Sequence, residues 1–193
     1  EQRSCGGSTQ KNIGAADVGS FGVRLVVDDA QGAAVEQSVK GLEAGQEREV
    51  RFDDVRLKKG EHKLAAVADD GAVRLWTLTP GAAPRPSHQL TVPGLPLGAA
   101  FSPDSSLLAV GTTDAQVHLW RLPEPTSSTE AEELPPLTGF ENYVYGVTFD
   151  PTGRYLAAGS TDRTVRIWDL TTPDEAVPVG AELRGPGDTV YAL

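Results

Sequence analysis

Side chains that could bind a metal ion or transfer protons are few and scattered along this chain. The histidines are His62, His88 and His118, and they lie on separate predicted strands with no cysteine or carboxylate at metal-ligand spacing. Three acidic pairs stand at predicted corners, where solvated turn residues explain them better than calcium ligands do. These pairs are Asp28-Asp29, Asp53-Asp54 and Asp69-Asp70. The sequence therefore predicts no metal site.

Catalytic motifs are also missing from the sequence. It contains neither a phosphate-binding glycine loop nor a nucleophile motif, so we expect no enzyme and no cofactor. Arg74 and Arg166 stand two positions before Trp76 and Trp168, which puts each pair on one strand face. A guanidinium stacked on an indole ring is a packing contact rather than a reactive site.

The composition excludes several classes of partner. The 193 residues carry a formal net charge of −10 and no cluster of lysine or arginine, which disfavours nucleic acid and anionic membrane surfaces. No segment has the apolar length of a membrane span. Cys5 is the only cysteine, so no intramolecular disulfide can form. The chain lacks methionine and begins with Glu1, which indicates a processed product or a fragment.

One hairpin pattern occurs three times and organises the rest of the sequence. Each copy has an apolar run, a short polar corner and a second run that contains a tryptophan, and the copies span residues 64–78, 107–122 and 153–170. The short corners predict antiparallel pairing of the two runs. The tryptophans are separated by 44 and 48 residues, a period typical of stacked-sheet repeats.

These units resemble WD repeats, the four-stranded blades of a β-propeller. The residues that carry the resemblance are Phe101-Ser102-Pro103-Asp104, Leu108–Asp114 and Val117–Trp120 in one copy, Phe149-Asp150-Pro151-Thr152-Gly153, Leu156–Asp162 and Val165–Asp169 in the next, and Leu64–Trp76 in the earliest. The resemblance covers residues 64–193 and implies an all-β chain with about three blades of an incomplete propeller. Thr189–Leu193 resembles the first strand of a fourth blade.

An incomplete propeller leaves blade faces open. Closed propellers have about four to eight blades, so we expect an apolar face at each end of the stack. Each face must be covered by the remainder of the protein, by another chain or by self-association.

The segment before the repeats resembles a CARDB domain, a cell-adhesion-related module of bacterial surface proteins. The matching residues are Phe21–Asp28, Gly41–Gln46, Phe52 and Gly60–Asp69. The resemblance implies an immunoglobulin-like β-sandwich. We expect residues 1–17 to form a flexible tail, residues 18–63 the CARDB-like segment, and residues 64–193 the blades.

The two resemblances overlap at Leu64–Asp69, which fits both the last strand of a sandwich and the second strand of a blade. Its two faces cannot fill two separate cores. In an alternative interpretation, Glu47–Val55 supplies the first strand of blade one, because about 50 residues make a marginal independent core.

The WD resemblance also implies a structural polar network in each blade. In the family, a histidine, a serine or threonine, an aspartate and the tryptophan are linked. The corresponding residues here are Ser160, Asp162 and Trp168, then Thr112, Asp114 and Trp120, and finally Asp70 and Trp76. The family histidine is absent, and Phe140 takes its place in one blade. We expect the aspartates to accept hydrogen bonds from their own corners.

The resemblance implies that one rim of the propeller binds a protein partner. Phe140, Asn142, Tyr143 and Arg163 combine the apolar, amide and charged character of a binding hot spot. Packing between blades explains Phe140 and Tyr143 equally well. The sequence thus favours a non-catalytic interaction scaffold. Two alternatives are a regulatory region of a larger bacterial signalling enzyme, such as a kinase or an ATPase, and an exported adhesion module. A cytoplasmic location fits the WD repeats, and an exported one fits the CARDB-like segment.

Overall fold

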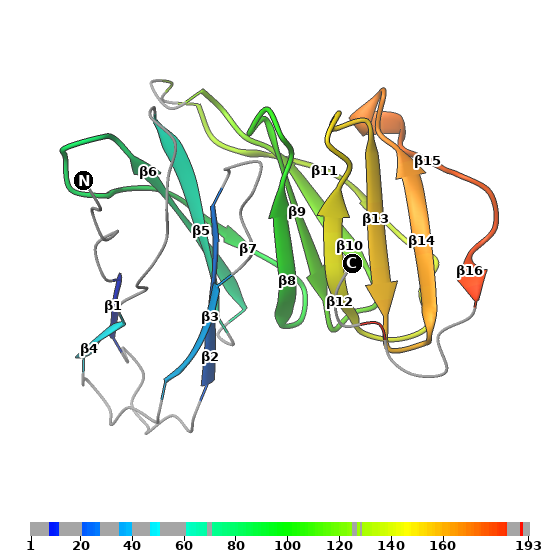
Figure 1. The fold of residues 1–193 in the computed structure, drawn as a ribbon, viewed down its shortest axis with the longest axis horizontal. Helices are drawn as coiled ribbons and strands as arrows, with labels where there is room; N and C mark the ends of the chain where they lie inside the picture. The colour runs from blue at the N-terminus through cyan, green and yellow to red at the C-terminus, as the bar shows by residue number, and fades with distance from the viewer. Residues whose placement is uncertain are drawn as a thin grey trace.

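The regular structure of the described residues consists almost entirely of antiparallel strands (Figure 1). The computed structural model describes residues 8–11, 21–27, 35–39, 47–50, 61–68, 71–124, 127, 129–184 and 190. One short 3₁₀ helix, η1 (Pro173–Glu175), lies among them. Within these ranges, no helix has the length and hydropathy needed to cross a membrane.

Three sheets follow one another along the chain and lie side by side in Figure 1. Blade one consists of β3 (Val35–Val39), β2 (Phe21–Val27), β5 (His62–Ala68), β6 (Ala72–Leu78) and β7 (Arg85–Thr91), in that order. Blade two consists of β8 (Pro96–Phe101), β9 (Leu107–Thr112), β10 (Val117–Arg121) and β11 (Glu132–Leu137). Blade three consists of β12 (Val144–Phe149), β13 (Tyr155–Ser160) and β14 (Thr164–Asp169), with β15 (Val177–Pro178) and β16 (Leu183–Arg184) both paired to β14.

The three hairpins predicted from the repeat share one register. Each tryptophan stands directly opposite a leucine of the preceding strand, in the pairs Leu64–Trp76, Leu108–Trp120 and Leu156–Trp168. Residues can therefore be compared between blades position by position. The predicted all-β fold with WD-like repeated sheets is confirmed.

Apolar side chains on both faces of the middle strands hold the blades together. Along β9, Leu108 and Val110 belong to the core between blades one and two, while Leu107 and Ala109 belong to the core between blades two and three. Successive side chains of a strand point to opposite faces, so a strand between two neighbouring sheets needs an uninterrupted apolar run. The run Leu107–Val110 meets that requirement.

A pair of glycines allows neighbouring blades to approach closely. A Cβ at Gly111 would lie 2.6 Å from the carbonyl oxygen of Val144, the first residue of blade three. Gly159, the equivalent residue of blade three, has the same relation to Val190, whose Cγ1 would lie 2.5 Å from such a Cβ. Both positions therefore require glycine for packing.

Blade one departs from the sequence-based expectation. The prediction that Glu47–Val55 supplies its first strand is wrong, because β2 pairs with β5 and so occupies that position. The strand β4 (Glu47–Val50) pairs instead with β1 (Ser8–Lys11) in a separate two-stranded sheet. Both edges of β2 are paired, one with β3 and one with β5, and its sequence FGVRLVV is more apolar than the EREV of β4.

Candidate functional site

The loops at one end of blades two and three form the candidate site, which we call the rim. It consists of residues 93–95 and 139–143, which precede the first strand of each blade, and of the corners 113–116 and 161–163. Backbone bonds join loop to corner in the same way in both blades. The N–H of Thr113 donates to the oxygen of Leu95 at 3.0 Å, and the N–H of Thr161 donates to that of Tyr143 at 2.9 Å.

In blade three, Asp162 fastens the loop to the corner. One of its carboxylate oxygens accepts from the N–H of Glu141 at 2.9 Å, and the other accepts from the N–H and hydroxyl of Thr164 at 2.8 and 2.6 Å. Burial opposes ionisation of Asp162, but hydrogen bonds from Thr164 and Glu141 outweigh it and lower the pKa of the carboxyl group. Ser160 also donates its hydroxyl to the oxygen of Asn142 at 3.0 Å.

In blade two, Asp114 binds its own corner but not the loop, because Pro93 stands at the position of Glu141 and has no N–H to donate. Its carboxylate accepts from the hydroxyl of Thr112 and from the N–H of Gln116. The other oxygen lies 2.9 Å from Nε2 of His118. No hydrogen bond between either aspartate and a tryptophan indole is among the contacts of the described residues. The structure brings the aspartate next to the hydroxyl residue in both blades.

The tryptophan of blade one is more exposed than those of blades two and three. Trp120 and Trp168 are each 3% exposed, whereas Trp76 of blade one is half-buried. The Asp70 that was assigned to the network of blade one lies outside the described residues.

The structure divides the four predicted partner-binding residues into two groups. Phe140 is buried, and its ring lies 5.8 Å from that of Trp168, so its side chain supports the loop from below. Asn142, Tyr143 and Arg163 are exposed on the same loop and corner. Arg163 has a φ of 70°, a left-handed conformation that turns the chain at the corner.

Leu95 is an exposed rim residue that the sequence analysis missed. It stands in blade two at the position of Tyr143, since both oxygens accept from the corresponding threonine N–H. Leu95 is 43% exposed and Tyr143 is 46% exposed. The repeat alignment could have paired these two residues, but sequence alone did not show that both side chains face solvent.

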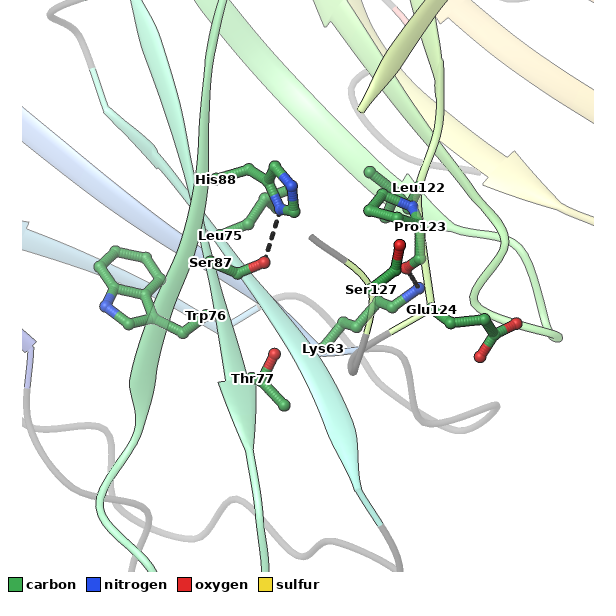
Figure 2. Close-up of a pocket in the computed structure, with 10 residues that line it drawn as sticks. All are labelled: Lys63, Leu75, Trp76, Thr77, Ser87, His88, Leu122, Pro123, Glu124 and Ser127. Atoms are coloured by element: carbon green, nitrogen blue, oxygen red, sulfur yellow. Dashed lines mark hydrogen bonds between the residues drawn. The ribbon is translucent and has the colours of Figure 1, made fainter. Parts of the chain in front are cut away.

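The seam between blades one and two holds a small cavity (Figure 2). Lys63 crosses the seam and donates to the oxygens of Ser105 and Pro123 at 2.8 and 3.0 Å. His88 lies 3.1 Å from the oxygen of Thr129 and 2.6 Å from the hydroxyl of Ser87. The cavity measures about 20 Å³, which is room for a water molecule but not for a substrate. These polar residues therefore join two blades.

The described part of the chain contains no cluster of side chains arranged to bind a metal ion. Within it, no three His, Cys, Asp or Glu side chains converge as ligands. Asp150 accepts from Thr152 and from the N–H of Tyr155, and these bonds lower the pKa of its carboxyl group. A carboxylate fixed by its own turn has a structural role.

Comparison with protein families confirms both resemblances. Residues 87–121 and 132–169 match the family model described as WD domain, G-beta repeat, and residues 8–73 match the model described as CARDB. The CARDB match extends from β1 into β6, so it overlaps the sheet of blade one.

Individual proteins with similar sequence or structure carry WD repeats. The chain is 40% identical over 73 residues to WD repeat and SOCS box-containing protein 1 of Takifugu rubripes, which covers 37% of this chain and 16% of that protein. Two solved structures, titled "Structure of U3-55K" and "Crystal structure of RRP9 WD40 repeats", each have a TM-score of 0.55, 25% sequence identity and cover 67% of this chain. The chain spans 38% and 37% of those two chains.

Proposed function

We propose that this chain is a non-catalytic protein-interaction scaffold that binds its partner through the rim. The similarity to WD repeats supports a scaffold in general terms. We choose the rim as the binding surface because an exposed apolar side chain occurs there at the same position of successive blades. These side chains are Leu95 in blade two and Tyr143 in blade three. Large apolar and aromatic side chains on a well-supported surface are typical binding anchors.

The loops that carry these side chains are held in place before a partner arrives. Hydrogen bonds from the corner threonines fix the backbone at Leu95 and Tyr143, and Asp162 fixes the neighbouring Glu141. A surface that is already ordered loses less conformational entropy on binding. Asn142 and Arg163 add polar contacts beside Tyr143, while Phe140 supports the loop from the core.

Site-specific crosslinking in the source cells tests the proposal. A photoreactive amino acid placed at Tyr143 or Leu95 of the full chain should give a discrete crosslinked species. The same amino acid at Thr152, which is exposed at the opposite end of blade three, should not. Equal crosslinking at Thr152, or none at either rim position, would contradict the rim as the binding surface.

Once the crosslinked protein is identified, its affinity can be measured directly. Tyr143→Ala should weaken binding by about tenfold, a free-energy loss of about 1.4 kcal/mol that is typical of an interface anchor. The melting temperature should stay the same, since Tyr143 is exposed. Phe140→Ala serves as the contrasting variant and should lower stability by about 3 kcal/mol because its buried ring packs on Trp168.

Each alternative function proposed from the sequence has its own requirement that can be tested. A regulatory region of a signalling enzyme would require a catalytic domain in the same gene product. An exported adhesion module would require an export signal and a partner that binds the CARDB-like segment. Self-association would be disrupted by a charge on an open blade face, and Tyr143→Ala would leave it unchanged.

A further inference from the structure

Two buried nitrogen atoms among the described residues have no hydrogen-bond partner, and they occupy equivalent positions. They are Nδ1 of His118 on β10 and Nε of Arg166 on β14. The two side chains correspond because both stand two residues before the tryptophan of their blade. The ring of His118 is buried, and its Nε2 lies 2.9 Å from Asp114. The carboxylate of Glu133 lies 3.7 Å from Nδ1.

The protonation state of His118 decides whether Nδ1 can be satisfied. An ionised carboxylate only accepts hydrogen bonds, so Nε2 donates its proton to Asp114. In the neutral ring, Nδ1 then carries a lone pair that faces a second acceptor, the carboxylate of Glu133. Protonation turns Nδ1 into a donor aimed at Glu133. The imidazolium can therefore form two charge-assisted contacts where the neutral imidazole forms one.

The other blades have a permanent cation at this position. Arg74 stands there in blade one and Arg166 in blade three. In blade three, the guanidinium of Arg166 lies 3.6 Å from the carboxylate of Glu182, which immediately precedes β16. In blade two, the corresponding contact is the one between His118 and Glu133 of β11. A cation of the third strand thus faces a carboxylate of the outer strand in both blades. Blade two differs because histidine changes its charge between about pH 5 and 8.

The strand that Glu133 belongs to connects blades two and three. Leu134 and Leu137 of β11 are buried in the core between these blades, where Leu170 and Ala176 of blade three also lie. Arg121 pairs with Glu132 of the same strand and with Asp174 of blade three. Weaker pairing of β11 with β10 would therefore loosen the packing between blades two and three.

The geometry points to a proton-operated clasp, in which protonated His118 bridges Asp114 and Glu133 and holds β11 against β10. Within 4 Å of the ring, Asp114 and Glu133 are the carboxylates among the described residues, and the ring of Trp120 lies 6.0 Å away. Only the protonated ring can donate from both nitrogens, so the contact to Glu133 is made by the imidazolium and is lost when the ring gives up its proton.

NMR titration of the histidine rings in the full chain tests the clasp. Glu133→Gln keeps the shape of the side chain and removes its charge, so the midpoint of the His118 titration should move to lower pH by about half a unit, a threefold loss of proton affinity. The titrations of His62 and His88 should not move. Glu130→Gln, an exposed neighbour outside the ion-pair contacts, is the matched control and should leave His118 unchanged.

Hydrogen exchange at the amide of Leu134 reports on the strand itself. After correction for the intrinsic pH dependence of exchange, opening at Leu134 should increase at least threefold from pH 5.5 to pH 8. His118→Arg, which supplies the permanent cation of the other blades, should remove this increase. The clasp is refuted if Glu133→Gln and Glu130→Gln shift the His118 midpoint equally, or if His118→Arg retains the pH-dependent opening. If His118→Arg does not fold, the Glu133→Gln titration alone decides.

Discussion

Blades two and three have the same strand register, yet among the described residues a neighbouring sheet covers both faces of blade two and one face of blade three. Leu119 of β10 is fully buried, whereas the equivalent Ile167 of β14 is only partly buried. Val179 and Leu183 are 46% and 56% exposed. Their counterparts Leu134 and Leu137 in blade two are buried. The repeated sequence therefore determines the strand pairing within each sheet. The burial of a side chain depends on whether another sheet packs against its face.

The open face of blade three contains an apolar hollow of about 380 Å³. Tyr155, Ala157, Ile167 and Val179 are among the residues that line it. The equivalent side chains of blade two are covered by the tryptophan-bearing face of blade three. The same amino-acid pattern is thus a core in one blade and a surface in the next.

The largest expected effect is a difference between equivalent truncations on these two faces. Leu119→Ala should lower the free energy of unfolding by about 3 kcal/mol, because it leaves a cavity in a sealed core, and Ile167→Ala by only about 1 kcal/mol, because solvent fills the space. Urea denaturation followed by tryptophan fluorescence measures both. Equal losses would show that the face of Ile167 is covered in solution.

A smaller difference is expected at the two packing glycines. Gly111→Ala should cost about 2 kcal/mol, because the added methyl meets the backbone oxygen of Val144 inside the stack. Gly159→Ala should cost about 1 kcal/mol, because the added methyl meets Cγ1 and Cβ of Val190, a residue outside the described strands that can shift more easily than β12. Thermal unfolding measures both changes. A larger loss at Gly159 than at Gly111 would contradict this order.

Much of the blade architecture could be predicted because it depends on contacts between residues near in sequence. The hairpins, their corners and the pairing of each tryptophan with a leucine follow from local apolar runs separated by short polar turns. The buried role of Phe140 could not be assigned, since it depends on Trp168 across the blade. Exposure of Leu95 and Tyr143 also depends on which loops surround them.

The first strand of blade one shows why distant pairing was harder to predict. The strand β2 pairs with β5 across an interval of more than 30 residues, and several alternating segments lie between them. One of the two interpretations of the sequence used Glu47–Val55, which is nearer to β5 and requires a shorter connection. The alternation of apolar residues in Phe21–Val27 predicts a strand, but it does not show which other strand the edges pair with.

Acid sensitivity should distinguish the aspartate of the blade three corner from its exposed neighbour. The pKa of Asp162 is lowered in the folded chain, so its contribution is present above the ordinary pKa of aspartate and is lost as the pH falls through the folded value. Asp162→Asn should lose about 1 kcal/mol at pH 7, allowing for partial exposure, and less below about pH 3. Glu141→Gln should change neither value. Urea denaturation at both pH values checks this, and an equal loss at pH 3 would show that the charge is irrelevant.

The smallest expected effect concerns the left-handed residue of each corner, where the blades differ in amino acid but not in backbone. Gly71, Ala115 and Arg163 have φ values of 77°, 67° and 70° at equivalent positions. Glycine adopts this conformation without the steric cost that a Cβ brings. Ala115→Gly should therefore stabilise the chain by about 0.5 kcal/mol, after the greater entropy of glycine in the unfolded chain is subtracted. Ala83→Gly, in an exposed loop without positive φ, should destabilise it by a similar amount, and destabilisation by both variants would show that the corner of blade two is not strained.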